Sequence, residues 1–238
     1  PRFAPTSTQE ELDVAATLRR ETPGSLMHTH VSENLGEIAW VRSLFPKSNG
    51  YLDVYDSSGL LGPGAVLAHG VHLTLPERIR VAETHSAVAH CPTSNLFLGS
   101  GLFHVHQAKN LHHNMTVGLG TDIGAGTSFS ILSTMNEAYK VAQLTQYPLD
   151  SIKMLYLGTL GGAQALGIQD KIGSLEVGKE GDVIVLDPQA TDLLAVRSAR
   201  VEALEEQLFV LATMGDDRTV AATYVGGELA YSRDGHSA

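Results

Sequence analysis

Four short apolar runs recur in the first half of the chain, and each is followed by a helical stretch or a glycine-containing loop. The runs are residues 26–31, 65–73, 87–92 and 116–122. Helical spacing is clearest at 34–45, 76–85 and 131–144. This strand-then-helix order is typical of βα units and predicts an α/β fold with a parallel sheet. Because the runs alternate little between apolar and polar residues, we expect strands that are covered on both faces.

The pattern changes after about residue 172. Residues 173–188 and 218–233 each favour a pair of strands with a glycine-centred turn, and a helical segment at 201–214 lies between them. We therefore expect two parts: an α/β part over residues 1–172, and a smaller β unit with a connecting helix over residues 173–238.

Composition narrows the classes of partner. The net charge of −10 over 238 residues argues against nucleic acid or an anionic membrane. No apolar run approaches the roughly 20 residues that a membrane helix needs, and no basic and apolar leader typical of secretion is visible. The single cysteine, Cys91, has no intrachain partner for a disulfide, so we expect a cytoplasmic location.

The end of the first apolar run combines two histidines with a glutamate. Alternate residues of a strand share a face, so His28 and His30 point to the same side. Glu33 follows His30 by three residues, where the strand gives way to a turn. Histidine suits zinc and other divalent metals, and a nearby carboxylate can move protons around a metal-activated water. The segment therefore predicts a site with a metal and an acid.

Further polar residues stand at the ends of the later runs. His69, His90 and Asp122 each fall at or near the C-terminal end of a predicted parallel strand, as His30 does. In a (β/α)8 barrel that edge holds the active site, which is built from residues of several strands. A single histidine near a strand end is more often structural than catalytic. Its recurrence at successive strands favours a shared site.

Two other motifs carry a weaker signal. Residues 104–114 contain four histidines in a polar setting, and we predict a solvated loop there. Residues 120–126 are rich in glycine but match neither of the usual nucleotide-binding patterns, so we expect no phosphate site.

Taken in order, these motifs resemble the amidohydrolase superfamily. HVSE at 30–33 is similar to its strand-five motif, AHG at 68–70 to its strand-six histidine, and GTD at 120–122 to its strand-eight aspartate. HCPTSN at 90–95 resembles the strand-seven stretch, and residues 157–187 resemble the return from the barrel into a β-sandwich. The resemblance implies strands four to eight of a metal-dependent (β/α)8 TIM barrel over residues 1–172. It also implies part of a small β-sandwich domain over residues 173–238.

Three features resemble the guanine deaminase family within that superfamily. PRFAPTST at 1–8 is similar to the family's strand-four segment, whose arginine and phenylalanine contact the purine, and the matching residues are Arg2 and Phe3. TDIGAGTSFS at 121–130 resembles the family's extension after the metal-binding aspartate. Residues 209–231 resemble its C-terminal signature. The resemblance covers essentially the whole chain.

One departure from the superfamily pattern is large. A His-x-His pair on strand one supplies two metal ligands in the superfamily, and no segment before Pro1 is present to provide it. His28 and His30 are not that pair, because HVSE continues them directly and residues 1–8 precede them. We therefore expect these residues to be the C-terminal half of a longer protein. An incomplete barrel should also leave two unpaired sheet edges.

The resemblance also implies a role for each site residue. It implies one divalent metal, zinc with iron as the alternative, held by His30 and Asp122, with His69 as a further candidate ligand. Glu33 would protonate the purine ring at N3 and later pass a proton to the departing amine. His69 would orient the attacking water, and Asp122 would accept its proton. The implied substrate contacts are Arg2, Phe3, His30, Glu33 and Asp122.

The reaction implied by the resemblance is hydrolysis of guanine to xanthine and ammonia by a metal-activated water, in purine catabolism, with a homodimer as the expected assembly. Two alternatives stay open. One is a deaminase of the superfamily that acts on cytosine, a triazine or an adenosine derivative, and the other is a non-catalytic half-barrel. Deaminases that hold zinc through cysteines are disfavoured, because the chain has one cysteine and no PCxxC motif.

Overall fold

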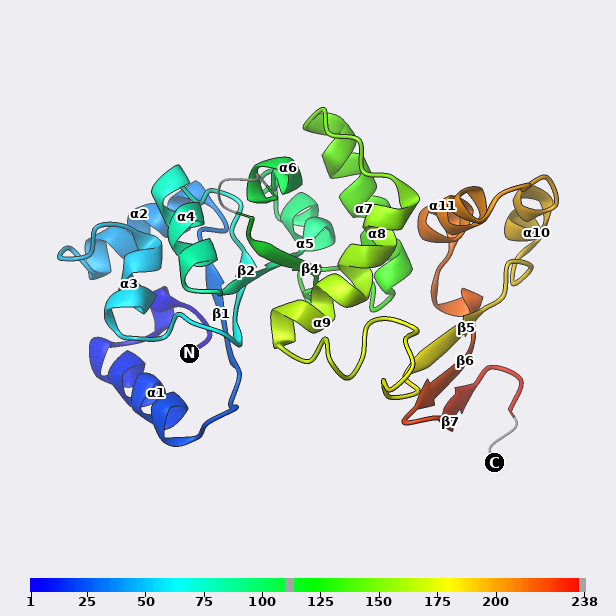
Figure 1. Ribbon diagram of the computed structural model, residues 1–238. Helices are drawn as coiled ribbons and strands as arrows, with labels where there is room; N and C mark the ends of the chain where they lie inside the picture. Colours follow the sequence, from blue (N-terminus) through cyan, green and yellow to red (C-terminus); the bar gives the residue numbers. More distant parts are fainter. Residues whose placement is uncertain (110–113, 236–238) are drawn as a thin grey trace.

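The computed structural model describes residues 1–109 and 114–235. It contains a four-stranded parallel sheet with helices packed around it and a three-stranded antiparallel sheet near the C-terminus (Figure 1). The predicted α/β class is therefore confirmed. Within the described ranges, none of the helices combines the length and apolar character that a membrane crossing requires.

The parallel sheet has the strand order β1-β2-β3-β4, so each strand pairs with the next one along the chain. Its strands are β1 (Met27–Val31), β2 (Ala65–His69), β3 (Ala87–His90) and β4 (Thr116–Leu119). All four predicted apolar runs thus contain a strand, and the parallel strands end at one edge of the sheet. In the part of the chain that the structure describes, this sheet stops at β1 and β4 and is open at both sides.

Helices connect the strands and cover the sheet (Figure 1). Before β1 lie η1 (Ala4–Thr6) and α1 (Gln9–Glu21). The connections carry α2 (Leu35–Leu44), α3 (Tyr51–Ser57), α4 (Leu75–Glu83), α5 (Pro92–Phe97) and α6 (Val105–Ala108). After β4 come α7 (Ile131–Leu144), α8 (Ser151–Gly158) and α9 (Leu160–Leu166). The helices predicted at 34–45, 76–85 and 131–144 are confirmed, with shifts of two residues or fewer at their ends.

Local sequence determines how several of these helices begin. Helices α1, α2 and α4 each start with a capping box, in which a polar side chain before the helix and a glutamate three residues later bond each other's backbone amides. In α2 the pair is Asn34 and Glu37. This cap directly follows Glu33, so it also fixes the backbone next to the candidate acid.

The core of the α/β part lies between the sheet and its helices. Leu67, Val88 and Val117 come from three neighbouring strands, are fully buried, and share one cluster with residues of α1, α3, α7 and α8. Burying a side chain of this size stabilises the fold by about 1.5–3 kcal/mol. Glycines allow α9 to lie directly on β4, because a Cβ on Gly118 would lie 2.9 Å from the Cα of Gly162.

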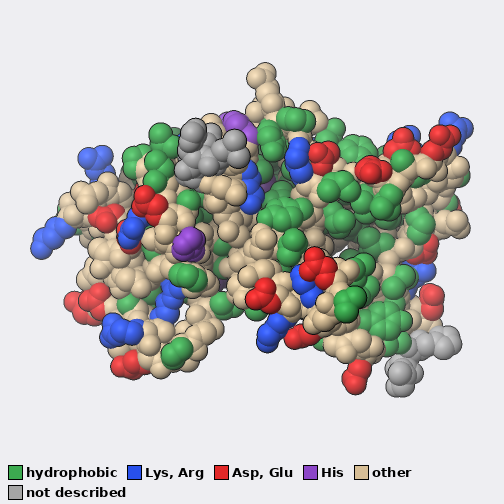
Figure 2. Space-filling view, viewed as in Figure 1, with side chains coloured by type: hydrophobic (Ala, Val, Ile, Leu, Met, Phe, Trp, Pro, Cys, Tyr) green, Lys and Arg blue, Asp and Glu red, His purple; other side chains and the backbone are tan. Residues whose placement is uncertain are grey.

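The second sheet is antiparallel, with the order β5-β6-β7. Its elements are β5 (Val183–Leu186), α10 (Asp192–Ser198), α11 (Leu204–Met214), η2 (Asp217–Thr219), β6 (Val220–Val225) and β7 (Glu228–Ser232). The strand pair predicted at 218–233 and the helix predicted at 201–214 are confirmed. Phe209 of α11 packs edge-on against Tyr139 of α7, with ring centroids 5.2 Å apart. Hydrophobic side chains gather on the exposed surface of this half of the molecule (Figure 2).

The predicted strand pair at 173–188 is wrong, because only β5 forms there and residues 173–182 contain no strand. Gly173 and Gly178 adopt φ values of 94° and 97°, which belong to turns rather than strands. Glu176 lies between the two glycines and forms an ion pair with Lys179, which follows the second glycine, at 3.1 Å. The two glycines therefore break the extended pattern that the apolar residues suggested.

Two further local predictions need correction. In residues 1–8 the structure has η1 at Ala4–Thr6 and no strand. The segment still runs beside β1, since the carbonyl oxygen of Arg2 accepts a hydrogen bond from the amide of His30 at 3.1 Å. Residues 104–114 are not simply a solvated loop: α6 buries Val105 and Ala108, although residues 110–113 lie outside the described ranges.

Candidate active site

Four polar side chains meet at the edge of the parallel sheet where its strands end. His30 lies in β1, His69 ends β2, Asp122 follows β4 and Glu33 follows β1. The Nε2 atoms of His30 and His69 lie 4.0 and 3.7 Å from the carboxylate oxygens of Asp122. His69 Nε2 also lies 3.7 Å from Oε2 of Glu33. The fold therefore gathers into one site the histidines, aspartate and glutamate on which the sequence interpretation rested.

The His30 ring is held in one orientation by the N-terminal segment. Its Nδ1 lies 2.7 Å from the carbonyl oxygen of Arg2. A carbonyl oxygen only accepts hydrogen bonds, so Nδ1 is the donor, and in the neutral form of the ring the lone pair is on Nε2. That lone pair is on the nitrogen that faces Asp122. Fixing one ring nitrogen in this way is how proteins prepare the other for a metal.

Tyr55 ties the N-terminal segment to the strand that carries His30. Its hydroxyl donates to the carbonyl oxygen of His30 at 2.8 Å and accepts from the amide of Ala4 at 2.7 Å. The side chain is fully buried, and this burial raises the pKa of the Tyr55 hydroxyl, which therefore stays neutral. One hydroxyl group thus connects the two segments that carry His30 and Arg2.

Replacing Tyr55 with phenylalanine is expected to lower the free energy of unfolding by about 2 kcal/mol, because two buried backbone groups lose their partner. Urea denaturation of the wild-type and variant proteins would measure the difference. Tyr139→Phe is the matched control, since the Tyr139 hydroxyl has no hydrogen-bond partner among the described residues. Equal stability losses in both variants would contradict this role of the Tyr55 hydroxyl.

The His69 ring is also oriented by a single polar partner. Its Nδ1 lies 2.8 Å from Oδ1 of Asn95, so Nδ1 donates and Nε2 faces the two carboxylates. The side chain is almost completely buried, and its ring stacks on that of His30 with centroids 5.2 Å apart. The two imidazoles therefore present their Nε2 atoms to the same small volume.

Glu33 is fixed at both its side chain and its backbone. Its Oε1 accepts a hydrogen bond from the Ser100 hydroxyl at 2.8 Å, and Oε2 faces His69. Its backbone amide donates to Oε2 of Glu37 at 2.9 Å, while Oε1 of Glu37 accepts from the Tyr51 hydroxyl at 2.6 Å. Burial and the adjacent carboxylate raise the pKa of Tyr51, so its hydroxyl remains a donor. The buried Glu37 thus anchors the turn that presents Glu33.

Backbone strain is concentrated at this site. Ser32, His69 and Asp122 adopt φ values of 48°, 70° and 48°, in the left-handed region that residues with a Cβ rarely enter. Such conformations cost about 1–3 kcal/mol each and persist where the surrounding structure imposes them, often at functional sites. Two of the three are residues of the cluster itself, and Ser32 directly precedes Glu33.

The two residues expected to contact a purine lie next to the cluster. The Phe3 ring packs against His30 with centroids 6.3 Å apart and against Trp40 with centroids 6.4 Å apart. The Arg2 guanidinium is exposed and lies 5.4 Å from the centre of the Phe3 ring. An aromatic face and a multiple hydrogen-bond donor therefore stand at the exposed side of the site.

The remaining histidines at strand ends do not join the cluster. His28 is exposed, and its ring stacks beside His30 with centroids 6.0 Å apart. His90 is fully buried against Phe103, and this burial lowers the pKa of its ring to about 3. His90 is therefore neutral at physiological pH. Within the described residues, the group suited to a metal consists of His30, His69 and Asp122.

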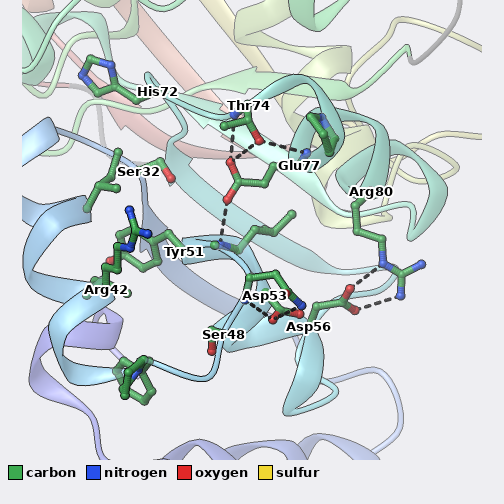
Figure 3. A pocket seen from close by; sticks show the side chains of 18 residues that line it. Ser32, Arg42, Ser48, Tyr51, Asp53, Asp56, His72, Thr74, Glu77 and Arg80 are labelled. Atoms are coloured by element: carbon green, nitrogen blue, oxygen red, sulfur yellow. Dashed lines mark hydrogen bonds and ion pairs between the residues drawn. The ribbon is translucent and has the colours of Figure 1, made fainter.

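A separate cavity of about 700 Å³ opens between α2, α3 and α4 (Figure 3). Its lining includes Ser32, Tyr51 and His72 but none of the four clustered residues. Polar groups in its wall bond one another; Glu77, for example, accepts from Thr74. We assign the chemistry to the histidine–carboxylate cluster, because two histidines and two carboxylates there face one small volume.

The cluster fits a divalent metal. One donor atom from each of His30, His69 and Asp122 lies within 4.8 Å of the other two. Donor atoms around tetrahedral zinc lie roughly 3.4 Å apart, which is close to the 3.7 and 4.0 Å that separate the histidine nitrogens from Asp122. Mixed imidazole and carboxylate donors suit zinc, and iron as well.

Sequence reasoning missed four residues that support the cluster: Tyr55, Glu37, Asn95 and Ser100. Glu37 carried a readable signal, because Asn34 and Glu37 form a capping-box pattern. The capping-box pattern does not predict that the Glu37 side chain also accepts a hydrogen bond from the backbone amide of Glu33. Tyr55 lies in a segment where the sequence showed no motif. Asn95 ends the HCPTSN stretch, whose resemblance carried no role for it, and Ser100 lies beyond that stretch.

Comparisons with known proteins find similar sequences over nearly the whole chain. Residues 1–230 match the sequence profile of the Amidohydrolase family. The chain is 51% identical over 234 residues to the guanine deaminase of Escherichia coli K12, covering 98% of this chain and 53% of that protein. The chain thus spans about half the length of the curated relatives it matches.

Solved structures of guanine and adenosine deaminases are similar to this chain. The structure of E. coli guanine deaminase matches 98% of this chain and 54% of its own, with a TM-score of 0.95 and 52% identity. That of guanine deaminase from C. acetobutylicum with bound guanine matches 97% of this chain and 54% of its own, with a TM-score of 0.86 and 32% identity. An adenosine deaminase from Xanthomonas campestris with bound zinc matches 95% of this chain and 50% of its own, with a TM-score of 0.83 and 26% identity.

Proposed function

The chain belongs to the amidohydrolase family, and on that premise we propose that it forms part of the active site of an enzyme that hydrolyses guanine to xanthine and ammonia. The observation that carries the proposal is the meeting of His30, His69, Asp122 and Glu33 beside Phe3. Similarity to guanine deaminases over nearly the whole chain supports guanine as the substrate. Because the chain spans about half of those relatives, the reaction is assigned to the whole protein that contains it.

His30 and Asp122 hold one divalent metal in this proposal, and His69 is near enough to be a third ligand. Zinc is the ion we propose, because the donor set suits it and the similar X. campestris deaminase contains it. When bound, the ion lowers the pKa of a coordinated water to about 7 and so makes a nucleophile available at neutral pH.

The side chains of this chain handle the protons. Glu33 protonates the purine ring at N3, which makes C2 electrophilic, and later passes a proton to the departing amine. Asp122 accepts the proton of the attacking water, and His69 orients that water through Nε2. The geometry supports these roles, since Glu33 Oε2 and Asp122 Oδ2 each lie 3.7 Å from His69 Nε2.

Arg2 and Phe3 recognise the purine in this proposal. The Arg2 guanidinium donates to the carbonyl and ring-nitrogen edge of guanine, and Phe3 lines the pocket beside His30. A site that hydrogen-bonds a polar edge discriminates strongly against bases that lack it, because its own polar groups are then left unpaired. Arg2 therefore contributes to specificity as well as to affinity.

We further propose the wider context of the chain. Residues 1–172 contribute strands to a (β/α)8 barrel, and residues 173–238 contribute to a β-sandwich domain. The parallel order of β1 to β4 and the TM-score of 0.95 to E. coli guanine deaminase support this arrangement. The whole protein acts in the cytoplasm as a homodimer; the net charge of −10 and the single cysteine are consistent with that compartment.

A second candidate is deamination of an adenosine derivative by the same site. It is favoured by the similarity to the X. campestris adenosine deaminase, which has half the identity of the E. coli guanine deaminase match. Rates of the whole protein on guanine, adenosine derivatives, cytosine and a triazine, measured side by side, would distinguish the candidates. We expect guanine to be the best substrate.

Arg2→Ala should lower kcat/KM for guanine by about 100-fold, the effect of losing a charged hydrogen-bond donor worth about 3 kcal/mol. Steady-state kinetics of the whole protein would measure it. Arg42→Ala is the control, because Arg42 is an exposed arginine on the wall of the separate cavity. A guanine rate unaffected by Arg2→Ala would contradict the proposed recognition of the purine.

A further inference from the structure

One segment forms hydrogen bonds with two residues of the site: Glu33, which carries protons in the proposed function, and His69, which orients the attacking water. It runs from residue 91 to residue 100, contains α5, and follows β3. Its Asn95 accepts from Nδ1 of His69 at 2.8 Å, and the hydroxyl of its Ser100 donates to Oε1 of Glu33 at 2.8 Å. His69 and Glu33 therefore share a support, although they follow different strands.

The segment holds its two polar residues as a unit. The amide of Ser100 donates to the carbonyl oxygen of Asn95 at 2.8 Å. The carbonyl oxygen of Ser100 in turn accepts from Nε2 of His72 at 2.8 Å. Both residues are buried, with 1% of Asn95 and 6% of Ser100 exposed. Glycines 99 and 101, with φ values of 68° and 130°, form the tight turn that aims the Ser100 side chain.

These two hydrogen bonds select which atoms face the reaction volume. Ser100 occupies Oε1 of Glu33, so Oε2 is the oxygen that faces His69 and is free to carry a proton. Asn95 occupies Nδ1 of His69, so Nε2 is the nitrogen that faces Glu33 and Asp122. Without these partners both side chains would sample other rotamers. The distance between Oε2 of Glu33 and Nε2 of His69 would then vary.

We propose that Asn95 and Ser100 are positioning residues: Ser100 holds Glu33 for proton transfer, and Asn95 holds His69 for orienting the attacking water. This inference rests on the proposed function. Neither residue forms a hydrogen bond with the proposed metal ligands His30 and Asp122, and Asn95 contacts the third candidate ligand, His69, only at Nδ1, the ring nitrogen that does not face the other two. Both act through another side chain, so their loss should slow the chemical step more than it weakens substrate binding. Guanine binding, through Arg2 and Phe3, should be largely preserved.

The test is steady-state kinetics of the whole protein that contains this chain, with Ser100→Ala and Asn95→Ala variants. We expect kcat to fall by about 10- to 100-fold, the effect of a small misplacement of reacting groups, while KM changes by less than about threefold. Metal content should stay at the wild-type level. Ser94→Ala is the matched control, because the Ser94 hydroxyl is buried in the same segment and has no partner among the described residues.

A conservative variant guards against simple misfolding. Ser100→Thr keeps a hydroxyl at the same place and should retain kcat within about threefold of wild type, since the hydrogen bond to Glu33 is preserved. The inference is overturned if Ser100→Thr loses as much kcat as Ser100→Ala, or if Ser100→Ala behaves like Ser94→Ala.

The experiment separates this inference from the proposed function. All variants are compared on the substrate that the wild-type protein turns over fastest. A best substrate other than guanine contradicts the proposed function. The kcat ratios on that substrate still decide whether Asn95 and Ser100 position His69 and Glu33, because any deamination at this site needs the same attacking water and proton transfers.

Discussion

Replacing Glu33 with glutamine is expected to reduce turnover of guanine by about 10⁴-fold, the upper range for general acid–base catalysis. The amide of glutamine has the size of the carboxyl group and can still accept from Ser100, but it cannot take up and release a proton. KM should change little, because Arg2 and Phe3 still contact the purine and the glutamine side chain has the size of the glutamate that it replaces. This variant therefore isolates proton transfer from the other functions of the site.

The measurement combines steady-state kinetics with elemental analysis of the purified whole protein. Glu33→Gln should contain as much metal as the wild type, because Glu33 lies outside the proposed ligand group. Glu83→Gln is the control, since Glu83 is an exposed glutamate near the end of α4. Activity of Glu33→Gln comparable to that of the wild type would exclude Glu33 as the proton carrier.

Replacing Asp122 with asparagine is expected to remove most of the bound metal and to lower kcat/KM by about 10³-fold, a loss of about 4 kcal/mol of metal-dependent stabilisation. Asp122 supplies the sole carboxylate of the three-donor group in the described residues. Neutral imidazoles alone balance none of the charge of a divalent ion. The same substitution also removes the group that accepts the proton of the attacking water.

Metal per chain after gel filtration, and activity with and without added zinc, would test this expectation. Asp170→Asn is the control, because it removes the same charge from an exposed position in the turn after α9. Chelation of the wild-type protein should abolish activity, and added zinc should restore it. Full metal content in Asp122→Asn would contradict the proposal that Asp122 is a metal ligand.

The helices and parallel strands could be predicted because their signals are local. Helix α7 spans the predicted residues 131–144, since an apolar face at helical spacing and the Ser130 cap act within one turn of the chain. The prediction failed at 173–188, where Gly173 and Gly178 override apolar residues that otherwise favour strands. At 1–8 the structure has η1 in place of a regular strand, although the carbonyl oxygen of Arg2 still accepts from the amide of His30 in β1.

The resemblance supplied the proposed roles of Glu33, His69 and Asp122, while strand-end position alone had marked His90 equally. Tertiary structure separates them. His90 is buried against Phe103, whereas His69 faces Asp122 and Glu33. The same histidine-after-strand pattern therefore produced one residue of the cluster and one neutral residue of the core.

By itself, the sequence determined the approximate positions of the four parallel strands and of several helices, and which polar residues stand near the strand ends, because those features depend on neighbours a few positions away. Only the tertiary structure decided which distant groups orient the side chains of the site. Ser100 reaches Glu33 across 67 residues, Asn95 reaches His69 across 26, and Tyr55 reaches His30 across 25. Such pairs depend on how whole βα units pack. The packing of buried side chains between sheet and helices sets their distances, and no local pattern contains that information.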